Sequence, residues 1–119
     1  MIDHVELKSR DVEASKAFYE QVLKPLGYER RPAGNGIGFA DGTGFDFFLV
    51  AGEPPSDVHF AFRAGTRDQI DEIYENAGSA GFTLDRAPAL TPHIHPNYYA
   101  GYLRDPDGRL VEFVCHAAV

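Results

Sequence analysis

Residues 105–116 read DPDGRLVEFVCH and combine a tight turn with a short apolar run. The DPDG tetrapeptide is typical of a turn, because proline presets its own φ and glycine can take a positive φ. The apolar and β-branched residues of 110–115 predict a strand with one carboxylate, Glu112, in its middle. Burying an unpaired carboxylate is costly, so Glu112 taken alone is expected to face solvent. It would face a cation on the inner side of a cup if other residues supplied partners.

Composition limits the class of protein. With 119 residues, 44% of them hydrophobic, the chain is expected to form a single domain, residues 1–119, around a small core. A net charge of -7 argues against nucleic acid or an anionic membrane as partner and leaves small molecules and protein subunits. The single cysteine, Cys115, allows no internal disulfide, and the first residues do not resemble a signal peptide. We therefore expect a cytoplasmic protein.

The chain divides into two halves that share one order of elements. The first half, residues 1–51, predicts a helix between Asp11, a suitable N-cap, and Pro25. Its alternating apolar runs and turn clusters predict strands at 2–8, 28–31, 36–40 and 45–50. Residues 52–56, GEPPS, form a linker.

The second half, residues 57–119, repeats that order. Thr66 and Gln69 form a capping box that predicts the start of a helix. Strands are expected at 58–64, 82–84, 98–104 and 110–115, with a loop at 88–96 that carries His93 and His95. The prediction is an α+β fold of two βαβββ modules, which form an open curved sheet, or cup, with the helices outside.

Laying one half on the other aligns candidate ligands. His4 falls opposite His59, each in the first strand of its half, and Phe48 falls where Glu112 stands. The large apolar neighbours of these residues are expected to face the helices, which turns His4, His59 and Glu112 toward the hollow of the cup. Two imidazoles and a carboxylate are suited to one divalent ion, Zn, Ni, Mn or Fe(II).

Three other side chains are candidates for chemistry beside the metal. Tyr98 and Tyr102 share a strand face, where a phenol could pack or serve as a hydrogen-bond donor or acid/base group, and Tyr102 is our candidate catalytic phenol. His95 is a candidate for substrate contact, whereas His93 and His116 are expected to be structural.

Two further residues complete the sequence-based predictions. Arg63, on the face of His59, could pair with Glu6 or meet an anionic substrate. Cys115 alternates away from Glu112, so it is expected to be a buried core thiol.

The sequence resembles the vicinal-oxygen-chelate superfamily, the group of glyoxalases, bleomycin resistance proteins and extradiol dioxygenases. The segments that carry the resemblance are MIDHVEL, SRDVEASKAFYEQVLKPLGY, VHFAF and NYYAGYLRDPDGRLVEFVCH. The resemblance implies a metal site at His4, His59 and Glu112, and a homodimer. Glyoxalase I has a further glutamate where this chain has Phe48, so the pattern departs from glyoxalase I at that position.

Three functions are compatible with the sequence. The first is a metal-dependent lyase, isomerase or dioxygenase acting on a small oxygen-chelating metabolite, with Glu112, Tyr102 and His95 as catalytic candidates. The second is a protein that binds and sequesters a small molecule, as bleomycin resistance proteins do. The third is a domain whose cup serves only subunit assembly.

Overall fold

The structure is a computed structural model that describes residues 2–34 and 36–118. The first module contains β1 (Val5–Ser9), α1 (Val12–Leu23), the 3-10 helix η1 (Lys24–Leu26), β2 (Glu29–Ala33), β3 (Gly36–Ala40) and β4 (Phe45–Ala51). The second contains β5 (His59–Arg63), α2 (Arg67–Ser79), β6 (Thr83–Leu84), β7 (Ala89–Leu90), β8 (Tyr99–Arg104) and β9 (Leu110–Cys115). The predicted α+β fold with two βαβββ modules is confirmed.

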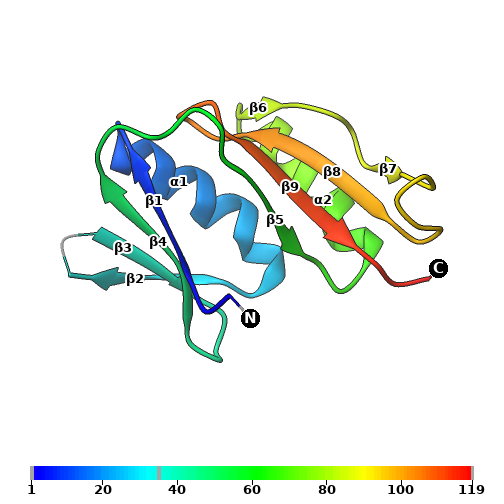
Figure 1. Cartoon of the computed structure of the whole chain (residues 1–119), viewed down its shortest axis with the longest axis horizontal. Helices are drawn as coiled ribbons and strands as arrows, with labels where there is room; N and C mark the ends of the chain where they lie inside the picture. The colour runs from blue at the N-terminus through cyan, green and yellow to red at the C-terminus, as the bar shows by residue number, and fades with distance from the viewer. Residues whose placement is uncertain (1, 35, 119) are drawn as a thin grey trace.

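The strands form two mixed sheets that lie side by side (Figure 1). The first sheet has the order β1-β4-β3-β2, and the second has the order β5-β9-β8-β6, with β7 also paired to β8. In each sheet the first strand of the module pairs in parallel with the last. The short strand β7 lies within residues 88–96, which we expected to be a loop, so that expectation is wrong at Ala89–Leu90.

Both helices begin at the predicted capping residues. Asp11 accepts a hydrogen bond from the Ala14 amide at 3.1 Å, and Thr66 and Gln69 form a complete capping box. The helices lie behind the sheets in Figure 1, one on each module. Within residues 2–34 and 36–118, neither helix is long and apolar enough to span a membrane.

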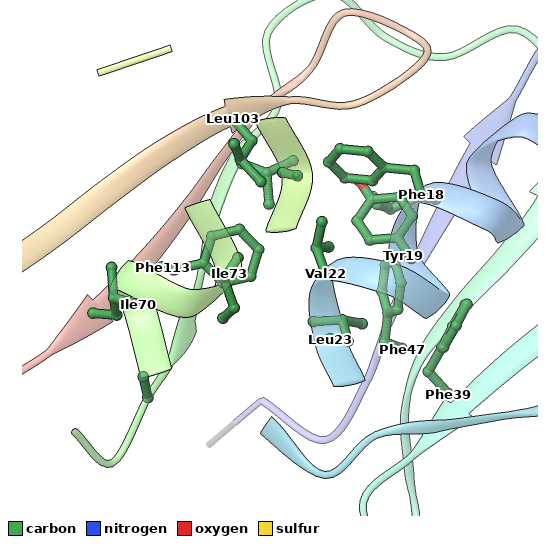
Figure 2. Packing of buried hydrophobic residues seen from close by; sticks show 14 of the residues in the cluster. Phe18, Tyr19, Val22, Leu23, Phe39, Phe47, Ile70, Ile73, Leu103 and Phe113 are labelled. Carbon is green, nitrogen blue, oxygen red and sulfur yellow. The ribbon is translucent and has the colours of Figure 1, made fainter. Parts of the chain in front are cut away.

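One hydrophobic core joins the two modules between the helices and the sheets (Figure 2). The rings of Phe62 and Phe113 stack at 5.6 Å within the second module. Phe62 also meets Phe47 of the first module edge-on at 5.5 Å. Cys115 is fully buried in the same core, as expected. Outside this core, Ala100, Tyr102 and Val114 of the second sheet form a smaller buried cluster.

The turn before β9 ties the modules together through buried charges. Asp105 and Arg109 are 4% and 5% exposed, and the Arg109 Nε donates to Asp105 Oδ2 at 2.7 Å. The Tyr19 hydroxyl of α1 donates to the same oxygen at 2.6 Å. Arg109 Nη1 donates to the backbone oxygen of Lys8 at 2.7 Å, which links this turn to β1. The turn therefore connects the two modules as well as reversing the chain.

Candidate metal and substrate site

The open face is the side of each sheet that is turned away from the helices. On β9, Val111 and Phe113 are buried in the shared core, so Glu112 between them projects to the open face. Glu112 is paired with Ala61 on β5, and Phe48 is paired with Glu6 on β1. The strand register therefore confirms that Phe48 and Glu112 hold equivalent positions in the two modules.

Glu112 is a buried carboxylate with a donor on each oxygen. His59 Nε2 lies 3.0 Å from Oε1, and the Tyr98 hydroxyl donates to Oε2. Since the carboxylate can only accept, the His59 proton is on Nε2. Glu112 is 4% exposed, whereas the His59 side chain is 53% exposed. The expectation that Glu112 alone would face solvent is wrong, because these two partners satisfy its charge under a cover of side chains.

Tyr98 keeps its proton at neutral pH. Burial, together with the hydrogen bond to Glu112 and the charge of that carboxylate, raises the pKa of Tyr98 to about 12. The phenol is therefore a hydrogen-bond donor to Glu112 and not a ready base.

Tyr102 lies directly across from Glu112 in the β8–β9 register, but its ring has another partner. The Arg86 guanidinium lies 3.8 Å from the centre of the Tyr102 ring, a cation–π contact. Burial and the charge of Glu112 raise the pKa of Tyr102, with Arg86 opposing the shift. Tyr102 is the phenol that we expected to be catalytic, and a second phenol, Tyr98, also reaches Glu112, as the donor to Oε2.

His4 directly precedes β1 in the first module and is separate from the other two predicted ligands. Its Nδ1 is 2.8 Å from Asp3 Oδ1, and its ring meets Phe48 edge-on at 5.5 Å. Among the residues that the structure describes, no three His, Cys, Asp or Glu side chains are grouped so as to hold a metal ion. Within one chain the structure thus brings together His59 and Glu112, but not His4.

The loop histidine His95 contacts the C-terminal end of the chain. Its Nε2 lies 2.6 Å from Nδ1 of His116, and both rings meet the edge of Tyr98. We expected His116 to be structural and did not expect it to contact His95. His116 follows the last residue of β9, so strand alternation does not place its side chain, and no local pattern in the sequence pairs it with His95. His93 and Arg63 are exposed.

The pair of His59 and Glu112 fits part of a divalent-metal site. An imidazole nitrogen and a carboxylate oxygen at 3.0 Å, on an accessible face, are donors that Zn, Ni, Mn and Fe(II) accept. Two ligands make an incomplete set, so a third protein donor has to come from outside this pair.

The comparisons with known proteins agree with the fold. Residues 1–113 match the Glyoxalase/Bleomycin resistance protein/Dioxygenase superfamily. The uncharacterized protein YqjT of Bacillus subtilis (strain 168) is 31% identical over 93% of this chain and 95% of its own.

Solved structures of similar proteins have the same fold over nearly the whole chain. A Bacillus halodurans protein superposes with a TM-score of 0.73 at 28% identity, over 97% of this chain and 95% of its own. A glyoxalase/bleomycin resistance protein from Albidiferax ferrireducens T118 has a TM-score of 0.79 at 24% identity, over 97% and 98%. The match over nearly the whole chain shows that this protein belongs to the glyoxalase, bleomycin resistance protein and dioxygenase superfamily.

Proposed function

We propose that the protein is a divalent-metal enzyme of lyase, isomerase or dioxygenase type that acts on a small metabolite with two adjacent oxygens. The observation that carries this proposal is Glu112, a buried carboxylate bonded to the accessible His59 on the open face. A carboxylate that only stabilised the fold would have no need of an exposed imidazole on a face outside the shared core. A buried carboxylate with an accessible partner on a sheet face is a candidate for a functional site.

The third ligand is proposed to be His4 of a second copy of the chain. His4 directly precedes β1 and aligns with His59, the first residue of β5, and its ring lies edge-on against Phe48 of the first sheet. A twofold homodimer that sets the first sheet of one chain against the second sheet of the other would bring His4 to His59 and Glu112 twice. The same pairing would enclose each open face.

The chemistry of such a site follows from its open coordination positions. Three protein ligands leave adjacent positions for a substrate with two oxygens, and the bound ion would supply Lewis-acid stabilisation of a developing oxyanion. The protein's own residues orient this site. His59 and Glu112 provide the metal-ligand atoms, and the Tyr98 hydroxyl fixes the carboxylate by donating a hydrogen bond to its other oxygen. Phe48 in place of a fourth ligand keeps one more position open than a four-ligand site has.

A mixing experiment tests both the ligand set and its location between chains. His4→Ala and Glu112→Gln homodimers should each fail to bind Co(II) tightly. After the two variants are unfolded together and refolded, mixed dimers should regain one intact site, made from His4 of the Glu112→Gln chain and from His59 and Glu112 of the His4→Ala chain. A site within one chain would give no recovery. Tight Co(II) binding by either homodimer would contradict the proposed ligands.

The second candidate function is binding of an aromatic compound without catalysis. It is supported by Phe45 and Phe48, whose rings stack at 5.5 Å on the first sheet, with Phe45 41% exposed. These rings could receive a planar ligand. Binding of an aromatic ligand that is unchanged by EDTA and by Glu112→Gln would favour this function over the metal enzyme.

A further inference from the structure

We propose that His95 and His116 form a positioning pair that holds the Tyr98 phenol on Oε2 of Glu112 and so reserves Oε1, the oxygen facing His59, for the metal. The inference rests on the proposed function, because it concerns the carboxylate that would bind the ion. It gives a role to two histidines that lie outside the proposed ligand set.

The hydrogen bonds assign the protons of the histidine pair. The Asn97 amide donates to His95 Nδ1 at 3.1 Å, so Nδ1 carries no proton. A neutral His95 ring must then carry its proton on Nε2, which donates to His116 Nδ1 at 2.6 Å. The pair is therefore a directed hydrogen bond from the loop to the residue that follows β9.

The same proton assignment argues against a second metal site at this pair. A metal ion on His95 Nε2 would displace the proton from that atom and move it to Nδ1, where it would oppose the Asn97 amide. Binding there would cost the existing hydrogen bond and require both rings to turn. The observed arrangement is that of two side chains that support each other.

The rings of His95 and His116 both pack against the ring of Tyr98. The two hydrogen-bonded rings lie side by side and nearly parallel, with centroids 4.9 Å apart and an interplanar angle of 22°. The Tyr98 ring meets each of them at 5.4 Å and nearly perpendicularly. The backbone is also fixed here, because the Tyr98 amide donates to the His95 oxygen at 3.2 Å. The ring therefore has little freedom to leave Glu112.

Because of Tyr98, the two oxygens of Glu112 have different partners. The Tyr98 hydroxyl occupies Oε2, and His59 faces Oε1. A carboxylate held this way offers a metal ion one oxygen in a fixed direction. Loss of an outer partner of a metal ligand usually weakens metal binding about 10–100-fold, so the chain from His116 to Tyr98 should be measurable in the affinity for metal.

A double-mutant cycle on Co(II) affinity tests this chain of contacts. Tyr98→Phe should weaken Co(II) binding about 10–100-fold, and His116→Ala should weaken it in the same direction. If His116 acts through the Tyr98 hydroxyl, His116→Ala should have no further effect in the Tyr98→Phe background. His116→Asn should recover part of the loss, because its side-chain oxygen can accept from His95. The exposed loop residue His93→Ala is the matched control and should leave the affinity unchanged.

Two readouts separate this inference from the proposed function. Nitrogen-15 NMR of the metal-free protein should show the His95 proton on Nε2; a proton on Nδ1 would overturn the inference whatever the metal does. In the loaded protein, the visible absorption of Co(II) should change in Tyr98→Phe and His116→Ala together.

Three outcomes of the Co(II) titrations would contradict the inference. Equal affinity of wild type and His116→Ala, or additive losses in the double variant, would overturn the positioning role and leave the metal site standing. Wild-type protein that does not bind Co(II) through His59 and Glu112 would overturn the proposed function and the inference with it. Far-UV circular dichroism of each variant checks the fold. Substitution of His116 should leave the fold intact, because this side chain is exposed.

Discussion

Phe48 and Glu112 stand at the same position of the two modules, each on the strand that pairs in parallel with the first strand of its module. Each of these residues contacts the equivalent histidine of its module: Phe48 meets the ring of His4, and Glu112 is hydrogen-bonded to His59. The two open faces therefore differ in one decisive respect, a ring in one and a negative charge in the other. Each chain carries one acidic and one aromatic half of the proposed site.

Phe48→Glu should convert the aromatic half into an acidic one. In the proposed dimer the new carboxylate would lie beside His4 and add a fourth donor, so Co(II) should bind more tightly because the site gains one negative charge. Competition with a chelator measures the change. Phe48→Gln is the matched control, and equal affinity of the two variants would argue that Phe48 does not face the metal.

Divalent metal should stabilise the folded protein through Glu112. A ligand present at about 100 times its Kd adds roughly 2.7 kcal/mol to the free energy of unfolding, which raises the Tm. The increase should be reversed by EDTA and absent in Glu112→Gln. Thermal unfolding with and without Co(II) makes the measurement. An equal rise in Tm for Glu112→Gln would place metal binding elsewhere.

The buried Arg109 should matter far more to stability than the nearby exposed Arg104. Arg109→Met leaves Asp105 buried without its guanidinium partner, and such a loss costs about 3–5 kcal/mol in the free energy of unfolding. Arg104→Met breaks an ion pair with Asp85 whose arginine is 43% exposed, so its cost should stay below about 1 kcal/mol. Urea unfolding compares the two variants. Similar losses would show that the Asp105 cluster does not join the modules.

Stability should fall in alkaline solution as the half-buried phenols of Tyr98 and Tyr99 ionise. Burial raises the pKa of Tyr98 and Tyr99 to about 12, with hydrogen bonds to Glu112 and Asp71 adding to the shift. The folded state thus holds these protons more tightly than the unfolded state, whose tyrosines titrate near 10. Their contribution to stability is complete below pH 10 and is lost as the pH rises toward 12.

Phenolate absorbance and circular dichroism, followed together against pH, test this expectation. Tyr99→Phe should flatten the pH dependence of the unfolding free energy between pH 10 and 12, because it removes one of the shifted groups. Normal titration of all tyrosines near pH 10 in a protein that is still folded would contradict the burial of these phenols.

Much of this architecture could be predicted from local sequence. Turn chemistry at DPDG, the capping box at Thr66 and alternation of apolar residues depend on neighbours within a few positions, so they placed the helices and the long strands correctly. The internal repeat then predicted that His59 and Glu112 share one face and that Phe48 is the equivalent of Glu112 in the first module. Both predictions hold because the parallel pairing of first and last strands has the same register in the two modules.

The remaining features depended on contacts between distant segments. β7 has only two residues and is stabilised by its pairing to β8, so it carries no periodicity of its own. Alternation places Tyr98 and Tyr102 on one face of the strand. The cation–π contact of Arg86 with the Tyr102 ring and the hydrogen bond from the Tyr98 hydroxyl to Glu112 are set by the tertiary structure.

The histidines show the same division. Alternation determined that His4 and His59 each face away from the helices, since a side chain's strand face follows from its parity. That His4 lies apart from Glu112 in one chain, and that His95 meets His116, was decided only by how the sheets and the loop at 91–98 are arranged in space. Such arrangements are set by the packing of a shared core and by loop closure, which sum contacts across the whole chain and leave no signature at the residues themselves.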